Sequence, residues 1–355
     1  MDFEILHEFP SPKLEEAWRD CLSRVDFPAH YNAPEYFHVP FWAGRRPFAI
    51  LALENGAVTG VLTGLHLPGE VTCGLVSRPQ ICVDGTKDAN AVVDALLRGL
   101  LAEAGSTKLL SVYTWPSLEP PAFAQHRFRR RQLQGNVVLD LTLGPEALFR
   151  QFFHDRQRNI RYAEKHGVTV REATTREDIA AAYDVYRGWH KTSRKTVRDE
   201  NHSFDIFEKA SRLTKNRRLF LAEYSGKVIA INTFRFYPGG MFESASNQSL
   251  DEFLRLKPND LLQWRGIQWA CAHGLRRHSL GASHEFLRRF GGTIVPIIRY
   301  RLDRTWMRTY DLREALRDWG RSTLQKMPAS IQARVRRTRG DDTHPTPAGK
   351  KGTKA

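Results

Sequence analysis

Leu51-Ala-Leu-Glu-Asn-Gly-Ala-Val-Thr-Gly-Val61 and Leu221-Ala-Glu-Tyr-Ser-Gly-Lys-Val-Ile-Ala-Ile231 share one sequence pattern. Each stretch has an apolar run, a short turn that contains glycine, and a second apolar run, which is typical of a β-hairpin. The two turn glycines, Gly56 and Gly226, stand 170 residues apart. Hairpins are common, so the segments that follow decide whether a larger unit is repeated.

The segments after each hairpin recur in the same order. Residues 88–104 and 259–273 place apolar side chains at helical spacing, and each helix is predicted to end near a glycine, Gly105 or Gly274. A short strand, a basic and aromatic segment and a closing strand come next, at residues 108–113, 123–128 and 137–141 in the first half and 276–281, 286–290 and 294–302 in the second. Four elements that recur in order favour a duplicated α+β module over chance.

We therefore predict two tandem modules and a terminal segment. The first module spans residues 1–145, and the second spans residues 146–312 and opens with a helix at residues 146–166. A terminal helix is expected at residues 313–333. Residues 334–355 are rich in lysine and arginine and lack aromatic side chains, so we expect a disordered basic tail.

The length and composition are those of a two-domain globular protein. A chain of 355 residues is long for one domain and natural for two. No apolar run approaches the ~18 residues that a membrane-spanning helix needs. The first residues are acidic and mixed, unlike a secretion signal, so we expect a cytoplasmic protein.

The cysteines and the charge narrow the range of partners. The cysteines are scattered and form no CxxC pair, which argues against a metal site and against a disulfide framework. The formal net charge of +15 would attract polyanions such as nucleic acid, anionic lipid or a phosphorylated carrier. Charge alone does not distinguish such a partner from the absence of one.

Three motifs resemble those of a known family. Arg158-Asn-Ile-Arg-Tyr-Ala-Glu-Lys-His-Gly-Val168 is similar to the R-x-I-R-x-A-x-K-x-G-V signature of FemAB-like transferases, which belong to the GNAT superfamily. Leu256-Lys-Pro-Asn-Asp-Leu-Leu-Gln-Trp-Arg-Gly-Ile-Gln-Trp-Ala270 resembles the family's PN-x-L-x-W-x-x-I-x-W-A helix, and Phe286-Leu-Arg-Arg-Phe-Gly-Gly292 resembles its F-K-x-x-F-G-G turn. The resemblance runs from about residue 15 to residue 305. It implies an α+β fold of tandem GNAT-like modules, each a mixed sheet flanked by helices.

The sequence departs from the family pattern in two places. Arg277-His-Ser-Leu-Gly-Ala-Ser283 lacks the acidic side chain that family members often carry there. The segments at residues 77–87 and 249–258 hold a single glycine, Gly85, so the glycine-rich loop that cradles the coenzyme A pyrophosphate is missing. The donor therefore stays open between acyl-CoA, aminoacyl-tRNA and another activated acyl group.

Acyl transfer to an amine needs a deprotonated nucleophile and hydrogen-bond donors for the carbonyl oxygen. His190 is one candidate base, because it lies where a helix meets a polar loop and because imidazole titrates near pH ~6.5. Glu243, on a predicted strand, is another, since an apolar neighbourhood could raise its pKa. Tyr300 on the last strand could protonate a leaving group, although packing in the core explains a tyrosine at that position better.

The candidate substrate-binding residues carry positive charge or belong to the family helix. Arg158, Arg161 and Lys165 share one helical face and either hold an anionic group or are simply solvated. Arg194 lies in the polar loop that His190 opens. Asn259, after Pro258, is expected to be the N-cap of its helix and could face a phosphate there. Trp264 is assigned to the site because it belongs to the family helix.

These observations favour an N-acyltransferase that moves an acyl or aminoacyl group to an amine, and the family resemblance suggests cell-envelope or polysaccharide metabolism. We expect the active site in the second module, with a degenerate first module as one wall. The partners would be the acyl donor, the amine acceptor and, for an aminoacyl donor, tRNA; no metal is expected, and the oligomeric state stays open. The alternative is a non-catalytic basic RNA-binding or scaffold protein with the same fold.

Overall fold

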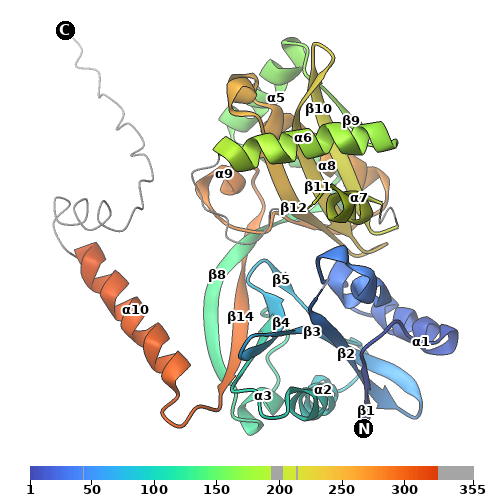
Figure 1. The fold of residues 1–355 in the computed structure, drawn as a ribbon, viewed down its shortest axis with the longest axis vertical. Coiled ribbons are helices and arrows are strands. Elements are labelled where there is room, and N and C mark those ends of the chain that lie inside the picture. Colours follow the sequence, from blue (N-terminus) through green and yellow to red (C-terminus); the bar gives the residue numbers. More distant parts are fainter. Residues whose placement is uncertain (43, 193–202, 213–214, 327–355) are drawn as a thin grey trace. The chain divides into compact units, whose positions relative to one another are not determined.

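The computed structural model describes residues 1–42, 44–192, 203–212 and 215–326 (Figure 1). The chain divides into two compact units, Met1–Leu302 and Asp303–Ala355. Arg194 and the predicted basic tail at residues 334–355 lie outside the described residues. Of the second unit, the structure describes the helix α10 (Thr309–Lys326), which begins before the predicted position of residue 313.

One mixed sheet runs through the first unit. Its strand order is β1-β2-β3-β4-β7-β14-β8-β13-β12-β11-β10-β9, with β5 paired to β4 and β6 paired to β3. The strands are β1 (Asp2–Leu6), β2 (Arg46–Glu54), β3 (Ala57–Leu67), β4 (Glu70–Leu75), β5 (Arg78–Pro79), β6 (Ile81–Val83), β7 (Leu109–Thr114), β8 (Arg129–Asp140), β9 (Thr169–Glu172), β10 (Arg217–Tyr224), β11 (Lys227–Phe236), β12 (Met241–Ser249), β13 (Arg277–Ser279) and β14 (Thr293–Asp303).

The helices flank this sheet. The α-helices of the first unit are α1 (Pro12–Ser23), α2 (Ala89–Ala104), α3 (Ala122–Gln125), α4 (Gly144–Gln151), α5 (His154–Lys165), α6 (Arg176–Thr192), α7 (Phe204–Ser211), α8 (Pro258–Ala272) and α9 (Glu285–Arg288). Short 3-10 helices are η1 (His30–Asn32), η2 (Pro34–His38), η3 (Pro40–Trp42), η4 (Leu141–Leu143) and η5 (Asp251–Leu256). In the second half, α6 contacts β11 and β12 from one face of the sheet, and α8 packs on the other face (Figure 1).

The two halves have the same element order, which confirms the predicted fold of two tandem α+β modules. The series β2-β3-β4-α2-β7-α3-β8 is repeated by β10-β11-β12-α8-β13-α9-β14. In both series the first three strands pair antiparallel, and the third pairs parallel with the strand after the helix.

The two hairpins also match in detail. Their turns place Asn55 and Gly56 at φ 51° and 78°, and Ser225 and Gly226 at φ 48° and 76°. A two-residue turn with positive φ at both central positions matches the twist of the flanking strands, which is why glycine is favoured in it. Each hairpin has a register shift at the same place, between Ala52 and Leu53 in one and between Ala222 and Glu223 in the other.

The last strand of each half is exchanged between the halves. β7 of the first half is followed in the sheet by β14, and β13 of the second half is followed by β8. As a result, β8 and β14 each run along both halves of one continuous sheet, pairing with each other from Thr293–Val138 to Arg301–Arg129. The module boundary at residue 145 stays a prediction.

We predict that Gly135→Ala strongly destabilises the protein, because Gly135 on β8 lies against the backbone of the exchanged strand β14. A Cβ there would be 2.0 Å from the carbonyl oxygen of Val295, and neither backbone can move without breaking the strand pair. The expected loss is about 3 kcal/mol of unfolding free energy, at the upper end for overpacking. Urea denaturation measures it, with Gly85→Ala as control, since its Cβ meets only an ordinary contact at 3.4 Å. Equal stabilities of the two variants would contradict the strand exchange.

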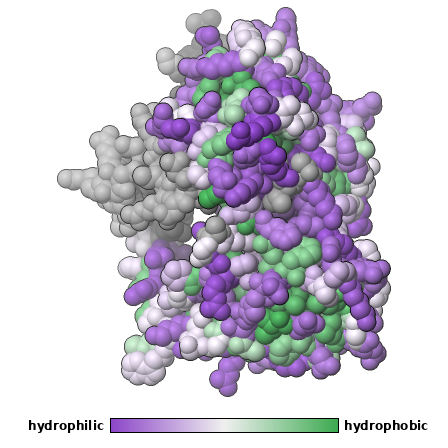
Figure 2. Space-filling view, turned by 45° about the vertical axis from the view of Figure 1, so that its right-hand side comes forward, coloured by the Kyte–Doolittle hydropathy of each residue, from purple (hydrophilic) through white to green (hydrophobic). Residues whose placement is uncertain are grey.

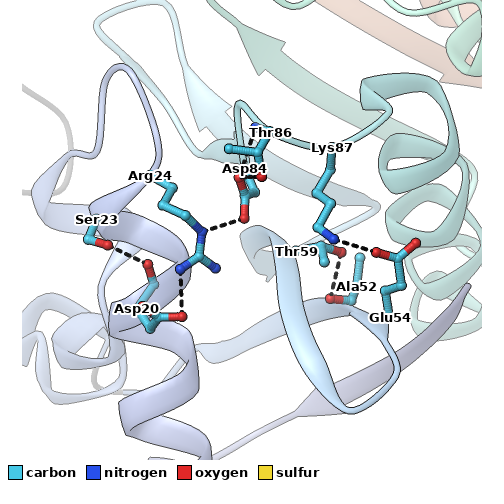
Figure 3. A network of polar contacts seen from close by, with 9 residues as sticks. All are labelled: Asp20, Ser23, Arg24, Ala52, Glu54, Thr59, Asp84, Thr86 and Lys87. Carbon is cyan, nitrogen blue, oxygen red and sulfur yellow. Dashed lines mark hydrogen bonds and ion pairs between the residues drawn. The ribbon is translucent and has the colours of Figure 1, made fainter.

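A polar network joins the elements of the first half (Figure 3). Arg24 at the end of α1 donates hydrogen bonds to Asp20 at 2.6 Å and to Asp84 at 2.6 Å. Burial would raise the pKa of Asp84, but the Arg24 guanidinium and the amide and hydroxyl of Thr86 outweigh it and hold that pKa below its usual range. The ion pair therefore fixes the loop that leads into α2 and is structural.

One sequence prediction about the helices is wrong. The helix expected at residues 146–166 is two helices, α4 and α5, because Phe152 takes an extended backbone with φ −64° and ψ 143°. The amide of Phe153 donates to the carbonyl of Arg289 at 2.9 Å, and Phe152 packs against Trp264 and Phe290. Packing of the aromatic residues thus outweighs the helical pattern.

The surface is mostly polar. Figure 2 shows apolar side chains gathered mainly on the lower part of the visible face, among polar ones. Within the described residues, every helix is too short or too polar to span a membrane.

Candidate active site

The central strands of the second half part from each other. β12 and β13 pair in parallel only from Met241–Arg277 to Glu243–Ser279. The chain after β13 then follows β8, with hydrogen bonds from Leu280 to Val137 and from Val137 to Ala282 at 2.9 and 3.0 Å. β12 continues to residue 249, so beyond Glu243 the backbone groups on its edge facing away from β11 no longer pair with β13. Backbone groups at such a gap can hydrogen-bond an acyl carbonyl.

Buried polar side chains hold the strands where they part. On the α8 side, Ser244 Oγ lies 3.1 Å from His278 Nε2 and 3.3 Å from Gln263 Oε1. Burial lowers the pKa of His278 to about 3, so its imidazole is neutral at physiological pH. His278 is therefore a structural hydrogen-bonding group and not a proton acceptor for the reaction.

A cavity of about 250 Å³ lies on the other face of β12, between the two halves. Ala245, Ser246 and Gln248 of β12 line it beside the point where the strands part. Its remaining walls combine four arginines with six aromatic side chains that come from both halves: Tyr31, Phe41, Trp42, Tyr186, Trp189 and Phe207. The parted edge of β12 therefore lies next to a cavity that can hold a small substrate.

A row of charged side chains crosses the sheet at this cavity. Arg217 on β10 is opposite Arg235 on β11, and Arg235 is opposite Glu243 on β12. All three residues are buried, with exposed fractions of 5%, 5% and 3%. From the first half, the hydroxyl of Tyr31 accepts hydrogen bonds from Arg235 at 2.6 Å and from Arg78 at 3.4 Å. Both guanidinium groups also lie over the Tyr31 ring, 4.5 Å (Arg78) and 4.7 Å (Arg235) from its centre.

The arginines control the ionisation of their neighbours. Burial would raise the pKa of Tyr31, but the charges of Arg235, Arg78 and Arg217 outweigh burial and lower that pKa to about 8. Burial itself lowers the pKa of Arg217 to about 10, and burial raises the pKa of Glu243. The region is therefore dominated by positive charge.

A domain known from other proteins matches the part of the sequence that contains this site. Residues 150–289 match the sequence profile described as the acetyltransferase (GNAT) domain. This profile covers most of the second half of the chain. A comparison with curated protein sequences finds no match. The matched residues include both parting strands and Arg217, Arg235 and Glu243, whereas Tyr31 and Arg78 come from outside the match.

Solved structures share the whole two-module fold. FemX is 13% identical with a TM-score of 0.65, covering 87% of this chain and 99% of FemX. L-PGS from Bacillus licheniformis is 13% identical with a TM-score of 0.59, covering 88% of this chain and 98% of L-PGS. A tandem GNAT protein from the clavulanic acid biosynthesis pathway, solved without AcCoA, is 13% identical with a TM-score of 0.52, covering 86% and 99%. At these identities the similarity concerns the fold.

Of the predicted site residues, His190 and Glu243 lie at the cavity or beside it. His190 at the end of α6 lines the cavity and packs edge-on against Tyr186, with 4.4 Å between ring centres. Glu243 belongs to the buried charged row, and its Oε2 has no hydrogen-bond partner among the described residues.

The predicted basic face of α5 lies elsewhere on the second half. Arg158, Arg161 and Lys165 are exposed, and the guanidinium of Arg161 lies 5.4 Å from the ring centre of Phe149. Their neighbour Arg156 points into the protein instead, with an ion pair to Asp260 at 2.5 Å and a stacking contact with Phe286 at 4.5 Å. The role of the exposed face in binding stays a prediction.

The prediction that Asn259 caps its helix is wrong. α8 begins at Pro258, and its N-cap is Lys257 in the left-handed conformation at φ 59°. Asn259 instead donates to Ser249 Oγ at 3.2 Å and lines a separate hollow with Lys257 and Asp260. Burial raises the pKa of Asp260, with Arg156 as its counter-ion. Asn259 as a binding residue stays a prediction.

The last two candidates are packed in apolar cores. Trp264 contacts Phe149 and Phe152 in the core of the second half. Tyr300 stacks on Phe123 of the first half, with 3.7 Å between ring centres. Neither is among the described residues that line the cavity.

Sequence reasoning missed the arginine–tyrosine cluster. Arg217 lies in step with Leu219 and Leu221 on its strand, and Arg235 stands between Phe234 and Phe236. An arginine inside each of two largely apolar strands was a usable signal. Tyr31 lies 204 residues from Arg235 along the chain, and no local pattern connects them.

No metal site is evident in the part of the chain that the structure describes, where no group of three or more histidine, cysteine, aspartate or glutamate residues could hold an ion.

Proposed function

We propose that the protein is an N-acyltransferase that moves an acyl or aminoacyl group from an activated donor to an amine. The observation that carries this proposal is the parting of β12 from β13 inside the GNAT domain, next to a cavity. In this arrangement the acyl carbonyl lies along the free edge of β12, and the amine reaches it from the cavity side.

The chemistry requires little from side chains. The amine nitrogen attacks the acyl carbon, the bond from that carbon to the donor's sulfur or ribose oxygen breaks, and the amine loses one proton. His190 lines the cavity and is the proposed acceptor of that proton, with Glu243 as the second candidate. Backbone amides of β12 would stabilise the negative charge that develops on the carbonyl oxygen. Tyr300 lies outside the cavity lining, so the proposed reaction takes no proton from it.

The donor is acyl-CoA or aminoacyl-tRNA. The similarity to the tandem GNAT protein, whose name mentions AcCoA, supports the first. The FemAB-like motifs and the similarity to FemX support an aminoacyl donor and a role in the cell envelope. The exposed Arg158, Arg161 and Lys165 could contact the phosphates of either donor, and the net charge of +15 suits a nucleic acid.

The test presents both donors to one protein sample. We expect one of acetyl-CoA or a pool of aminoacyl-tRNAs to bind, and to yield an amide product in a mixture of small amines, detected by mass spectrometry. Binding of RNA that weakens steeply with salt, without transfer from either donor, would instead support the non-catalytic alternative. Absence of both binding and transfer would contradict the proposal.

A further inference from the structure

We propose that Arg78, Arg217 and Arg235, together with the hydroxyl of Tyr31, bind an anionic group of the amine acceptor, either a carboxylate or a phosphate. The identification of the ligand as the amine acceptor rests on the proposed function, whereas the anion site itself does not. The acceptor would then be a compact molecule or residue that carries its amine and its acid group close together.

The positive charge of the arginines at the cavity exceeds the negative charge around them. The acidic groups whose charges act on Arg217 and Arg235 are Tyr31 and Glu243. Burial raises the pKa of Glu243, and even an ionised Glu243 would offset only one of the three guanidinium charges. The Nε atoms of Arg78, Arg217 and Arg235 are buried and have no hydrogen-bond partner among the described residues. A buried guanidinium without its hydrogen bonds is unfavourable, and a bound anion would supply them.

The arginine side chains converge on one place in the cavity. Arg217 and Arg235 are directly opposite each other on adjacent strands, while Arg78 and Arg235 meet at the ring and hydroxyl of Tyr31. All four residues line the same cavity. Guanidinium groups bind carboxylate and phosphate oxygens in pairs, so converging arginines are suited to either anion.

The size of the cavity limits which acceptors can bind. The cavity of about 250 Å³ is lined both by these arginines and by Ala245 and Ser246 of the parted strand. An acceptor that fills it must place its anionic group near the arginines and its amine near β12 at the same time. A simple alkylamine would leave the arginines without an anion, so it should be a poor acceptor.

Tyr31 reports on occupation of the site. Its hydroxyl takes hydrogen bonds from two arginines, and their positive charge favours its phenolate. A bound anion would take those donors and neutralise that charge. The pKa of Tyr31 should therefore rise when an anion binds, and anion affinity should fall as the pH rises through that pKa. The neighbouring rings of His30 and Tyr36 do not titrate in this range, because burial lowers the pKa of His30 and raises that of Tyr36.

The experiment is a titration of tyrosinate absorbance in the full chain, with the signal of Tyr31→Phe subtracted. Inorganic phosphate and acetate are added in separate arms, and sodium chloride at the same ionic strength is the reference. We expect one of the two anions to raise the Tyr31 pKa by about one unit, and the stronger arm identifies the chemistry of the group. Arg217→Gln or Arg235→Gln should weaken that anion's binding at least about tenfold, the loss expected for a charged hydrogen bond.

Two further variants keep the result interpretable. Arg235→Lys retains the charge and should retain part of the anion binding. It takes the place of Arg235→Gln in the comparison if that variant does not fold. Arg150→Gln removes an exposed arginine on α4 and should leave anion binding unchanged. Anion binding without acyl transfer would refute the proposed function but support this site. An unshifted Tyr31 pKa in both anions would overturn the site, and equal kcat/KM for amines with and without an acid group would overturn its role in acceptor choice.

Discussion

Ala245→Phe is expected to lower acyl transfer by at least about 100-fold, the scale of loss when reacting groups cannot align. Ala245 lies on β12 just past the last residue paired with β13, at the register shift between Thr233 and Phe234, and it lines the cavity. A phenylalanine ring there would occupy the space between the acyl group and the amine. Because the ring would enter an existing cavity, the fold should remain intact. Measurement of kcat/KM, with thermal unfolding in parallel, tests both expectations.

Ala124→Phe is the matched control. Ala124 is an exposed residue of α3 in the first half, outside the cavity lining. The same change of side chain there should leave kcat/KM and unfolding temperature close to those of the unmodified protein. Full activity of Ala245→Phe would show that the substrate does not pass this part of β12.

Arg156→Ala is expected to lower the free energy of unfolding by about 3–5 kcal/mol, the usual cost of removing one partner from a buried ion pair. The side chains of Arg156 and Asp260 are only 12% and 5% exposed, and the pair joins α5 to the first turn of α8. Its loss would leave the Asp260 carboxylate buried without its counter-ion. Arg158→Ala removes an exposed neighbour on α5 and should change stability by no more than about 0.5 kcal/mol. Urea denaturation of the two variants gives the comparison.

The pH dependence identifies the cause of that loss. Burial already raises the pKa of Asp260, and removal of Arg156 should raise it further. A carboxyl group with a raised folded-state pKa is destabilising when it is ionised, and the penalty disappears once the group is protonated in both states. The deficit of Arg156→Ala should therefore shrink as the pH falls toward the ordinary pKa of aspartate. A deficit that does not change with pH would assign the loss to packing against Phe286 instead.

Much of the fold could be predicted because it is repeated within the chain. The hairpins around Gly56 and Gly226 have local signatures, and the helices after them have apolar faces at helical spacing. The exchange of β8 and β14 had no such signature, because each strand has an apolar part and either could close either half. Sequence periodicity reports which face of a strand is buried, not which strand lies next to it.

The candidate site was predictable only where chemistry followed local structure. His190 was selected because it ends a helix beside a polar segment, and Glu243 because it lies on a predicted strand. The arginines of the cavity were missed because three sequence-distant segments bring them together around Tyr31. Arg158, Arg161 and Lys165 were chosen for their regular spacing, which is also typical of a solvated helix face.

Acyl transfer at the parted edge of β12 is tested most directly by mass spectrometry of the amide product. The unmodified protein, Ala245→Phe and Ala124→Phe each receive the same donor and the same amine that carries a carboxylate or phosphate. We predict an acceptor whose mass increases by that of the acyl group with the unmodified protein and with Ala124→Phe, and almost none with Ala245→Phe. Product at equal rates from all three proteins, or from none of them with either donor class, would contradict the assignment of this cavity as the active site.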